Sequence, residues 1–376
     1  MIYLDNAATT KPRKEAVDAA ILAAEEFGNP SSLHGLGLRA EKLINEAKDS
    51  IAKELNAEKR HIYFTSGGTE ANNLAIFGVA EAMQRAGKRV ITSRIEHPSV
   101  LEAFGRLSEL GYDVVFADAE RDGRISVDSV KSALTPDTIL VSVMHVNNET
   151  GVIQPVREIA DAVRAAAPKC IIHSDCVQSF CKIPVVPSRM GVDMVTISAH
   201  KIHGYKGCGA LYTGGKRLKP QIYGGEQQDE LRPGTENTAG ILAFGAACRA
   251  AARDTDGMRK KRELMRSELL RLVPDIIING SDEYNSGTVL NVSFLGIKAE
   301  ILLHSLERHE IYVSTGSACS SHKPQPSHVL TAMGADAKAV AGAVRISFAE
   351  TTTEDEIMEA AGKIAAEVKT IRRYMR

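Results

Sequence analysis

The chain alternates between short apolar runs and longer segments in which apolar residues recur every three or four positions. The segments SVLEAFGRLSELG (99–111) and VREIADAVRAAA (156–167) have the spacing of amphipathic helices. The short runs are apolar at successive positions, which is typical of strands buried on both faces of a parallel sheet. Six of them precede residue 200, at 61–66, 88–93, 112–117, 138–146, 170–175 and 193–198. The alternation predicts an α/β fold with a mostly parallel sheet, of the seven-stranded type, covered by helices.

The pattern changes after about residue 235. A long helical region (238–272) precedes a strand-like run at 288–296, and the chain ends in a helical pattern from Thr353 onward. We therefore expect two domains: a large one over 15–255, and a smaller α+β one formed by 1–14 and 256–376.

Charge and composition exclude several classes of protein. The 376 residues include 46 basic and 47 acidic side chains, so there is no net field to attract nucleic acid or an anionic membrane. No apolar run approaches the roughly 20 residues of a membrane helix, and the start, MIYLDNAATT, lacks the basic and apolar regions of a signal peptide. We expect a soluble, cytoplasmic protein.

Six cysteines in a chain of this length do not indicate a disulfide framework. Cys170, Cys176 and Cys181 lie near His173, which raises the possibility of a zinc site. No Cys-x-x-Cys pair is present, however, and the surrounding segment has the pattern of a buried strand and a turn. We interpret these cysteines as small core residues and predict no resident metal.

Polar residues follow the predicted strands. SGGTEANN (66–73) follows the first, and backbone N–H groups at Gly68 and Thr69 would suit a phosphate at a helix start, although a plain strand–helix turn fits equally well. Later strand ends carry an imidazole, amides, a carboxylate and an amine, at His97, Asn148, Asp175, Gln178, His200 and Lys201. Each has an ordinary structural explanation. Together they match the needs of pyridoxal phosphate: an amine to link it, a carboxylate for its ring nitrogen, a ring for stacking, and donors for its phosphate and phenolic oxygens.

Ten motifs, which lie between Tyr3 and Gly334, resemble those of the cysteine desulfurases, which are class V, fold-type-I pyridoxal-phosphate enzymes. They are YLDNAATT, GNPSSLHGLG, FTSGGTEANNLAI, EHPSV, NNETG, HSDCVQS, SAHKIHGYKG, RPGTEN, GSACSS and PSHVLTAMG. The set is similar to the first desulfurase group, in which the reactive cysteine lies in a long loop.

The resemblance implies a role for each matching residue. Lys201 would hold the cofactor covalently and move protons, and Asp175 would stay ionised beside the ring nitrogen. His97 would stack on the ring and shuttle a proton as a catalytic residue. The remaining implied contacts are Asn148 and Gln178 at the phenolic oxygen, Gly68, Thr69, Ser198 and His200 at the phosphate, and Thr235 reaching the phosphate from the second subunit of a homodimer. The glycines after Lys201 would let the backbone turn tightly against the cofactor.

Arg345 and Cys319 are implied to act on the substrate. Arg345 would bind the carboxylate of L-cysteine, with Asn148 nearby, although a surface arginine on an edge strand is the alternative. Cys319 lies in STGSACSSHKPQPSHVL (314–330), whose composition predicts a mobile, exposed loop. Its thiolate would take the sulfur as a persulfide, release L-alanine, and pass the sulfur to an acceptor protein for iron–sulfur cluster assembly or for tRNA or cofactor thiolation. The resemblance also allows Cys319 to ligate an iron–sulfur cluster with a partner.

Other functions on the same fold stay open. A class V aminotransferase or a selenocysteine lyase would share the cofactor residues, and the aminotransferase would need no thiol at position 319. A non-catalytic partner subunit would lack the lysine, the aspartate or the cysteine, and all three are present.

Overall fold

The computed structural model describes residues 1–315 and 326–375. Its largest sheet has seven strands in the order β2-β8-β7-β6-β5-β3-β4. The predicted strands are present as β2 (Ile62–Thr65), β3 (Arg89–Ser93), β4 (Asp113–Ala117), β5 (Thr138–Ser142), β6 (Ile171–Asp175) and β7 (Met194–Ser198). The pairs β3–β4, β3–β5, β5–β6 and β6–β7 are parallel, which confirms the mostly parallel α/β fold.

Sequence reasoning missed β8 (Gly209–Tyr212), which lies antiparallel to both β2 and β7. Because β2 and β7 both run antiparallel to β8, which lies between them, β2 and β7 point in the same direction. The carboxyl ends of β2, β3, β5, β6 and β7 therefore meet at one edge, where ligands bind in open α/β sheets.

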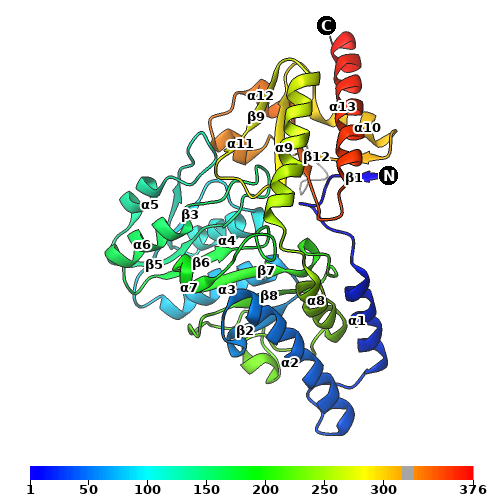
Figure 1. The fold of residues 1–376 in the computed structure, drawn as a ribbon. Helices are drawn as coiled ribbons and strands as arrows, with labels where there is room; N and C mark the ends of the chain where they lie inside the picture. The colour runs from blue at the N-terminus through cyan, green and yellow to red at the C-terminus, as the bar shows by residue number, and fades with distance from the viewer. Residues whose placement is uncertain (316–325, 376) are drawn as a thin grey trace.

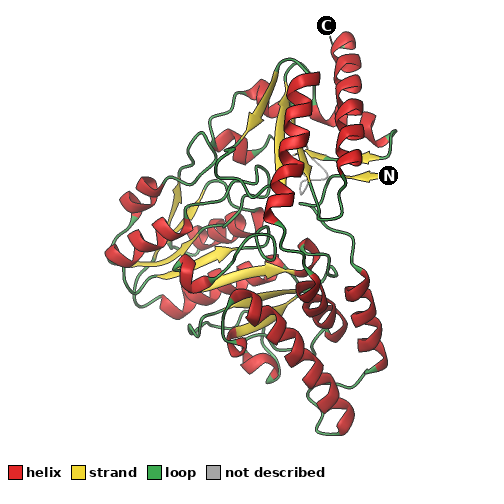
Figure 2. Ribbon diagram, in the orientation of Figure 1, coloured by secondary structure: helices red, strands yellow, loops and turns green. Residues whose placement is uncertain are grey.

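Both faces of this sheet are buried under helices (Figures 1 and 2). Successive strand residues point to opposite faces, so Leu140 packs in one apolar cluster and Val141 in another. One cluster includes α3 (Gly68–Met83) and α4 (Pro98–Glu109). The other includes α2 (Gly35–Leu55), α5 (Val127–Ala133), α6 (Val156–Ala166) and α8 (Thr238–Ala250), and α8 packs in turn against α1 (Lys14–Glu25).

The predicted helix over 238–272 is two helices, α8 and α9 (Thr255–Leu272). Arg253 has a φ of 55° and therefore leaves the right-handed helical region. Asp254 then caps α9, because its side chain accepts a hydrogen bond from the backbone N–H of Gly257 at 2.9 Å.

A third apolar cluster surrounds a second sheet, which has four strands in the order β12-β13-β10-β9. Its strands are β9 (Ile276–Asn279), β10 (Val289–Phe294), β12 (Ser314–Thr315) and β13 (Ala343–Ser347), and it packs with α9, α10 (Ala299–Glu307) and α13 (Glu354–Tyr374). Ile2 and Leu4 belong to this cluster, and β1 (Ile2–Tyr3) pairs with β11 (Ile311–Tyr312). The N-terminal segment thus runs beside the second sheet before it reaches α1 (Figure 1).

In the part of the chain that the structure describes, no helix combines the length and the apolar character needed to cross a bilayer.

Replacing Thr353 tests the predicted start of α13. Its hydroxyl accepts from the backbone N–H of Glu356 at 3.2 Å, and the Glu356 carboxylate accepts from the backbone N–H of Thr353 at 2.9 Å. Thr353→Ala should lower the free energy of unfolding by about 1 kcal/mol in denaturant titrations, because one of these two bonds is lost. Thr370→Ala, at an exposed position of the same helix, should change it far less, and equal effects would contradict this account of the cap.

Candidate active site

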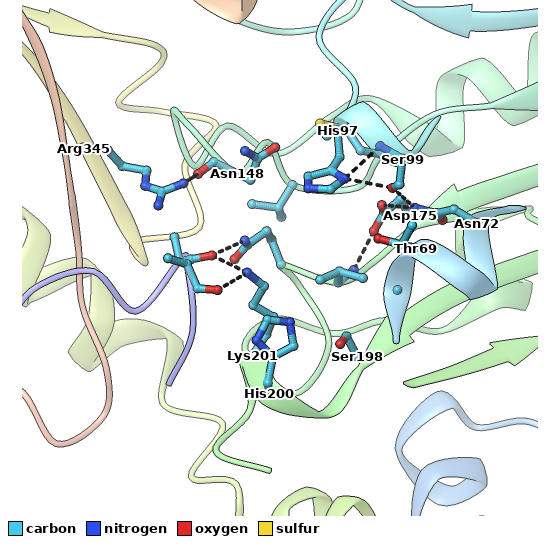
Figure 3. A pocket seen from close by; sticks show the side chains of 17 residues that line it. Thr69, Asn72, His97, Ser99, Asn148, Asp175, Ser198, His200, Lys201 and Arg345 are labelled. Atoms are coloured by element: carbon cyan, nitrogen blue, oxygen red, sulfur yellow. Dashed lines mark hydrogen bonds between the residues drawn. The ribbon is translucent and has the colours of Figure 1, made fainter. Parts of the chain in front are cut away.

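A cavity of about 420 Å³ opens at the carboxyl edge of the large sheet. Ten of the residues singled out from the sequence line it: Gly68, Thr69, His97, Asn148, Asp175, Gln178, Ser198, His200, Lys201 and Arg345. Figure 3 shows eight of them, labelled, with side chains that converge from several strand ends and from the second sheet: Thr69, His97, Asn148, Asp175, Ser198, His200, Lys201 and Arg345. Thr235 does not line this cavity and is exposed, and Cys319 lies outside the described residues.

Lys201 ends a short 3-10 turn (Ala199–Lys201) directly after β7. Its Nζ donates to the backbone oxygens of Ala7 at 2.6 Å and Ala8 at 2.7 Å. The N-terminal segment is held in place by Thr10, whose backbone N–H donates to the oxygen of His200. Sequence reasoning matched YLDNAATT to a family but missed this contact, since two alanines carry no side-chain chemistry.

Gly204 and Gly209, which follow Lys201, were expected to let the backbone turn tightly against the cofactor, but the structure shows them packed against other parts of the chain. A Cβ on Gly204 would lie 3.0 Å from the Cβ of Ala199, and one on Gly209 would lie 2.7 Å from the backbone of Gly67. Neither glycine lines the cavity. They let the turn and β8 pack against neighbouring backbone, which sets the positions of Lys201 and of the loop before α3.

Asp175, the last residue of β6, is buried with both carboxylate oxygens occupied. One accepts from the backbone N–H of Val177 at 2.9 Å, and the other accepts from Asn72 Nδ2 at 2.7 Å. These bonds fix the plane of the carboxylate. Gln178, on the same loop, donates to the backbone oxygen of Ala7 at 2.9 Å and so ties the loop to the N-terminal segment.

Several hydrogen-bond donors gather beside the start of α3. The first N–H groups of a helix have no partner within it, and Gly67 before α3 offers no side-chain cap. Ser198 Oγ is buried without a partner in the described part of the chain. Burial and the nearby Lys201 lower the pKa of His200 to about 4, so its imidazole is neutral at pH 7. A Cβ on Gly68 would lie 2.9 Å from Val177 Cγ2, so only glycine fits without a shift. This donor set suits an anion.

Arg345 is a buried residue of an inner strand, and the alternative of a surface arginine on an edge strand is wrong. Its Nη2 lies 2.8 Å from Asp5 Oδ1, and its Nη1 donates to the backbone oxygen of Asn148 at 3.0 Å. Its Nε is buried without a partner among the described residues. The guanidinium therefore keeps donors for a ligand in the cavity.

The cysteines noted in the sequence are core residues. His173 is buried, and its two ring nitrogens lie 2.8 Å from Ser142 Oγ and 2.9 Å from Thr196 Oγ1, so neither nitrogen faces a metal. Cys181 lies instead beside Cys248, with 3.7 Å between the sulfurs. Glu54 is near this pair, but its carboxylate is bound by Arg253 at 2.7 Å.

The chain matches the model of the family "Aminotransferase class-V" over residues 2–359. It belongs to this family. It is 39% identical to a protein of Dictyoglomus turgidum named cysteine desulfurase IscS, with 99% of this chain and 96% of that protein covered. It is 38% identical to the putative cysteine desulfurase IscS 1 of Bacillus subtilis, with 98% and 99% covered.

Solved structures of the same fold agree with this assignment. A NifS-like protein superposes with a TM-score of 0.92 at 34% identity, with 98% of this chain and 99% of that chain covered. SspA in complex with cysteine superposes with a TM-score of 0.83 at 33% identity, with 93% and 99% covered.

Pyridoxal 5′-phosphate is the cofactor of this family and of this protein. The residues present fit it. Ser198 Oγ, Asn148 Oδ1 and Arg345 Nε are buried polar atoms of the cavity wall without partners in the described chain, which is unfavourable unless a polar ligand meets them. The cavity also presents a lysine amine, an anchored carboxylate and an anion-binding helix start.

Glu96 supports the wall of the cavity beside His97. It is fully buried, and its Oε1 accepts from the Ser93 hydroxyl at 2.7 Å and from the backbone N–H of Met144 at 3.0 Å. Its Oε2 has no partner in the described residues. Burial raises the pKa of Glu96 from 4.5 to about 8, so the carboxyl group of Glu96 is protonated in the native protein at pH 7.

This proton makes stability depend on pH. The unfolded chain releases it near pH 4.5 and the native state only near pH 8, so the native state binds more protons between these values and loses stability as the pH rises. Between pH 7 and pH 9, deprotonation of Glu96 should lower the free energy of unfolding by about 1 kcal/mol. Glu96→Gln keeps the acceptor without the charge and should remove this loss in denaturant titrations at both pH values. Glu102→Gln, at an exposed position of α4, is the control and should lose as much stability between pH 7 and pH 9 as the wild type. If Glu96→Gln lost as much stability as the wild type over this range, the raised pKa of Glu96 would not be its cause.

Proposed function

We propose that this protein is a pyridoxal-phosphate-dependent cysteine desulfurase, which converts L-cysteine to L-alanine and leaves the sulfur as a persulfide on Cys319. The observation that carries the proposal is the arrangement of Lys201, Asp175 and the buried guanidinium of Arg345 around one cavity. The names of the relatives, cysteine desulfurase IscS, support the reaction, and the complex of SspA with cysteine supports the substrate.

The cavity residues divide the work of holding the cofactor, which supplies an electron sink for the substrate Cα when it is bound. Lys201 would form the covalent link and move protons at the substrate. Asp175 would lie beside the ring nitrogen, and His97 would lie against the ring. The phosphate would be held by Gly68, Thr69, Ser198 and His200, and the phenolic oxygen by Asn148 and Gln178.

Arg345 orients the substrate. A guanidinium matches a carboxylate with paired N–H donors, and Arg345 keeps N–H groups beyond those used by Asp5 and Asn148. Asn148, whose backbone oxygen anchors this guanidinium, brings its side chain to the same part of the cavity. In this proposal Asn148 therefore serves both the cofactor, through its side chain, and the substrate, through its contact with Arg345.

The sulfur step needs no external oxidant. The Sγ–Cβ bond of L-cysteine breaks, an S–S bond forms to Cys319, and Cβ gains a proton, so L-cysteine and the thiol become L-alanine and a persulfide. The persulfide then passes to an acceptor protein, either an iron–sulfur scaffold or a thiolation enzyme. The sequence places Cys319 between β12 and α11 (His328–Ala332).

A homodimer completes the site in this proposal, because Thr235 reaches the phosphate from the second subunit. Thr235 is exposed and is not among the residues that line its own cavity, which supports this role. The face formed by α1, the connection after it and the start of α2 exposes large apolar side chains, which suits burial against a second copy: Ile21, Leu22, Phe27, Leu33 and Leu38. We also propose the division into a large domain over 15–255 and a small domain formed by 1–14 and 256–376. The cluster around the four-stranded sheet lies wholly within the small domain, whereas Val329, Leu330 and Met333, from the small domain, pack in a cluster of the large sheet.

Replacing Cys319 tests the reaction. Cys319→Ala should lower persulfide and sulfide formation from L-cysteine at least a hundredfold, because the acceptor of the sulfur is lost, while the cofactor stays bound. Borohydride reduction followed by peptide mapping should label Lys201 in the wild type and in the variant. Ser320→Ala is the matched control and should retain turnover.

Other results would favour the alternatives. Full turnover in Cys319→Ala would contradict the mechanism. Conversion of amino acids to keto acids would indicate an aminotransferase. Release of selenium from selenocysteine, without release of sulfur from L-cysteine, would indicate a selenocysteine lyase. A borohydride label at any residue except Lys201 would defeat the assignment of the cofactor lysine.

Mixed dimers test the role of Thr235. Thr235→Ala homodimers should bind the cofactor about tenfold more weakly, because one hydrogen bond to a charged group is lost. A dimer of one Thr235→Ala subunit and one Lys201→Ala subunit should recover about half of the wild-type activity per dimer, since both changes fall in the same site and leave the other intact. No recovery above the Thr235→Ala homodimer would show that Thr235 acts within its own subunit.

A further inference from the structure

A chain of hydrogen bonds runs along one wall of the cavity from Asp175 to His97 (Figure 3). Asn72 Nδ2, on α3, donates to Asp175 Oδ2 at 2.7 Å and to Ser99 Oγ at 2.9 Å. Ser99 Oγ, in the first turn of α4, lies 2.8 Å from His97 Nδ1. Both linking side chains are buried, and neither carries a role in the function proposed above.

The orientation of the Asn72 amide fixes the first link. A carboxylate only accepts hydrogen bonds, so the NH₂ group of Asn72 must face Asp175. This orientation leaves Asn72 Oδ1 buried without a partner in the described chain, which carries a cost. A flipped amide would place the Asn72 oxygen against the oxygen of the Asp175 carboxylate, where the two would repel each other. Leaving Asn72 Oδ1 without a partner therefore costs less free energy than the flipped orientation.

The direction of the remaining hydrogens follows from that link. Ser99 Oγ accepts from Asn72, so its own hydrogen points to its other close neighbour, His97 Nδ1. The backbone N–H of Ser99 also donates to this nitrogen, at 3.1 Å. A nitrogen that accepts two hydrogen bonds carries its lone pair, so the hydrogen of the neutral ring is on Nε2.

The surroundings of His97 keep the ring neutral. Burial lowers the pKa of His97 most, and Lys201, His328 and Arg345 lower it further, while Asp175 acts in the opposite direction. Protonation of Nδ1 would in addition displace both donors of Ser99. The neutral form with hydrogen on Nε2 is therefore favoured by charge and by hydrogen bonding together.

We propose that Asn72 and Ser99 are positioning residues, which hold His97 as the Nε2–H tautomer and lock its ring to the carboxylate of Asp175. The inference rests on the proposed function for the role of His97. On this tautomer the nitrogen away from Ser99, which has no hydrogen bond to a described residue, presents an N–H and no lone pair to the cavity. His97 can then donate a hydrogen bond there but cannot accept a proton at this nitrogen, so removal of the proton from the substrate Cα is left to Lys201.

Nitrogen NMR of the holoenzyme tests the tautomer directly. With ¹⁵N-labelled histidine, two-bond ¹⁵N–¹H correlations distinguish the two neutral tautomers, and loss of one signal set in His97→Gln assigns His97. We expect the Nε2–H form in the wild type and a mixture of tautomers in Ser99→Ala, which keeps only the backbone donor. The Nδ1–H form in the wild type would overturn the proposal.

Kinetics separate positioning from a merely structural role. Ser99→Ala and Asn72→Leu should lower kcat for L-cysteine by about tenfold to a hundredfold with KM changed by less than about threefold, as loss of a supporting hydrogen bond does at other sites. Ser99→Thr restores the hydroxyl and should recover both kcat and the tautomer. Asn73→Ala, at a half-buried position of α3, and Ser108→Ala, at an exposed position of α4, are matched controls and should behave like the wild type.

The outcomes distinguish this inference from the proposed function. The expected tautomer in a protein that does not release sulfur from L-cysteine would support the positioning role and refute the function. Desulfurase activity with an unchanged His97 tautomer in both Ser99→Ala and Asn72→Leu would refute the positioning role alone. Lower thermal stability without a change of tautomer or kcat would show that the two residues serve only the fold, and would also refute it.

Discussion

The ion pair between Arg345 and Asp5 joins three parts of the chain that are far apart in sequence. Arg345 comes from the inner strand of the second sheet, Asp5 from the N-terminal segment, and the oxygen of Asn148 from the loop after β5 of the large sheet. Removing one partner of a fully buried pair costs roughly 3–5 kcal/mol, and the cost here is smaller because Asp5 is half-buried beside the buried Arg345. The cavity depends on the docking of the second sheet, because the large sheet alone does not supply the wall that carries Arg345.

Unpaired polar atoms mark where a ligand belongs. Folded proteins pair nearly all buried polar groups, yet Ser198, Asn148 and Arg345 each leave a buried atom without a partner among the described residues, and all three line one cavity. A chain selected only for stability would gain by filling these positions with apolar side chains. In the proposed function, Ser198 would meet a phosphate, Asn148 a polar substituent of the cofactor ring, and Arg345 the carboxylate of the substrate.

Much of the large sheet and its functional edge could be predicted from the sequence. Runs such as 138–146 and 193–198 are apolar on both faces, and parallel strands bring residues as distant as His97, Asp175 and Lys201 to one edge. The antiparallel strand β8 was missed because its four residues follow a glycine-rich turn and are too few for a periodic signal. Asn72 and Ser99 were missed because a polar residue near a helix start is usually solvated or a cap, and only the tertiary structure shows that both are buried. The burial of Arg345 required knowledge of the strand order in the second sheet.

The contacts of the N-terminal segment bear on how the protein is handled in the laboratory. The first residues of the chain make two kinds of contact in quick succession. Strand β1 pairs with β11, and a few residues later the backbone oxygens of Ala7 and Ala8 accept hydrogen bonds from the Lys201 amine. A deletion that starts at the first residue and extends past Asp5 is an active-site change and not a trimming of a loose end, because it removes the partner of Arg345 and then the two oxygens. Purification tags belong after the terminal helix α13, where Figure 1 shows the chain leaving the body of the molecule.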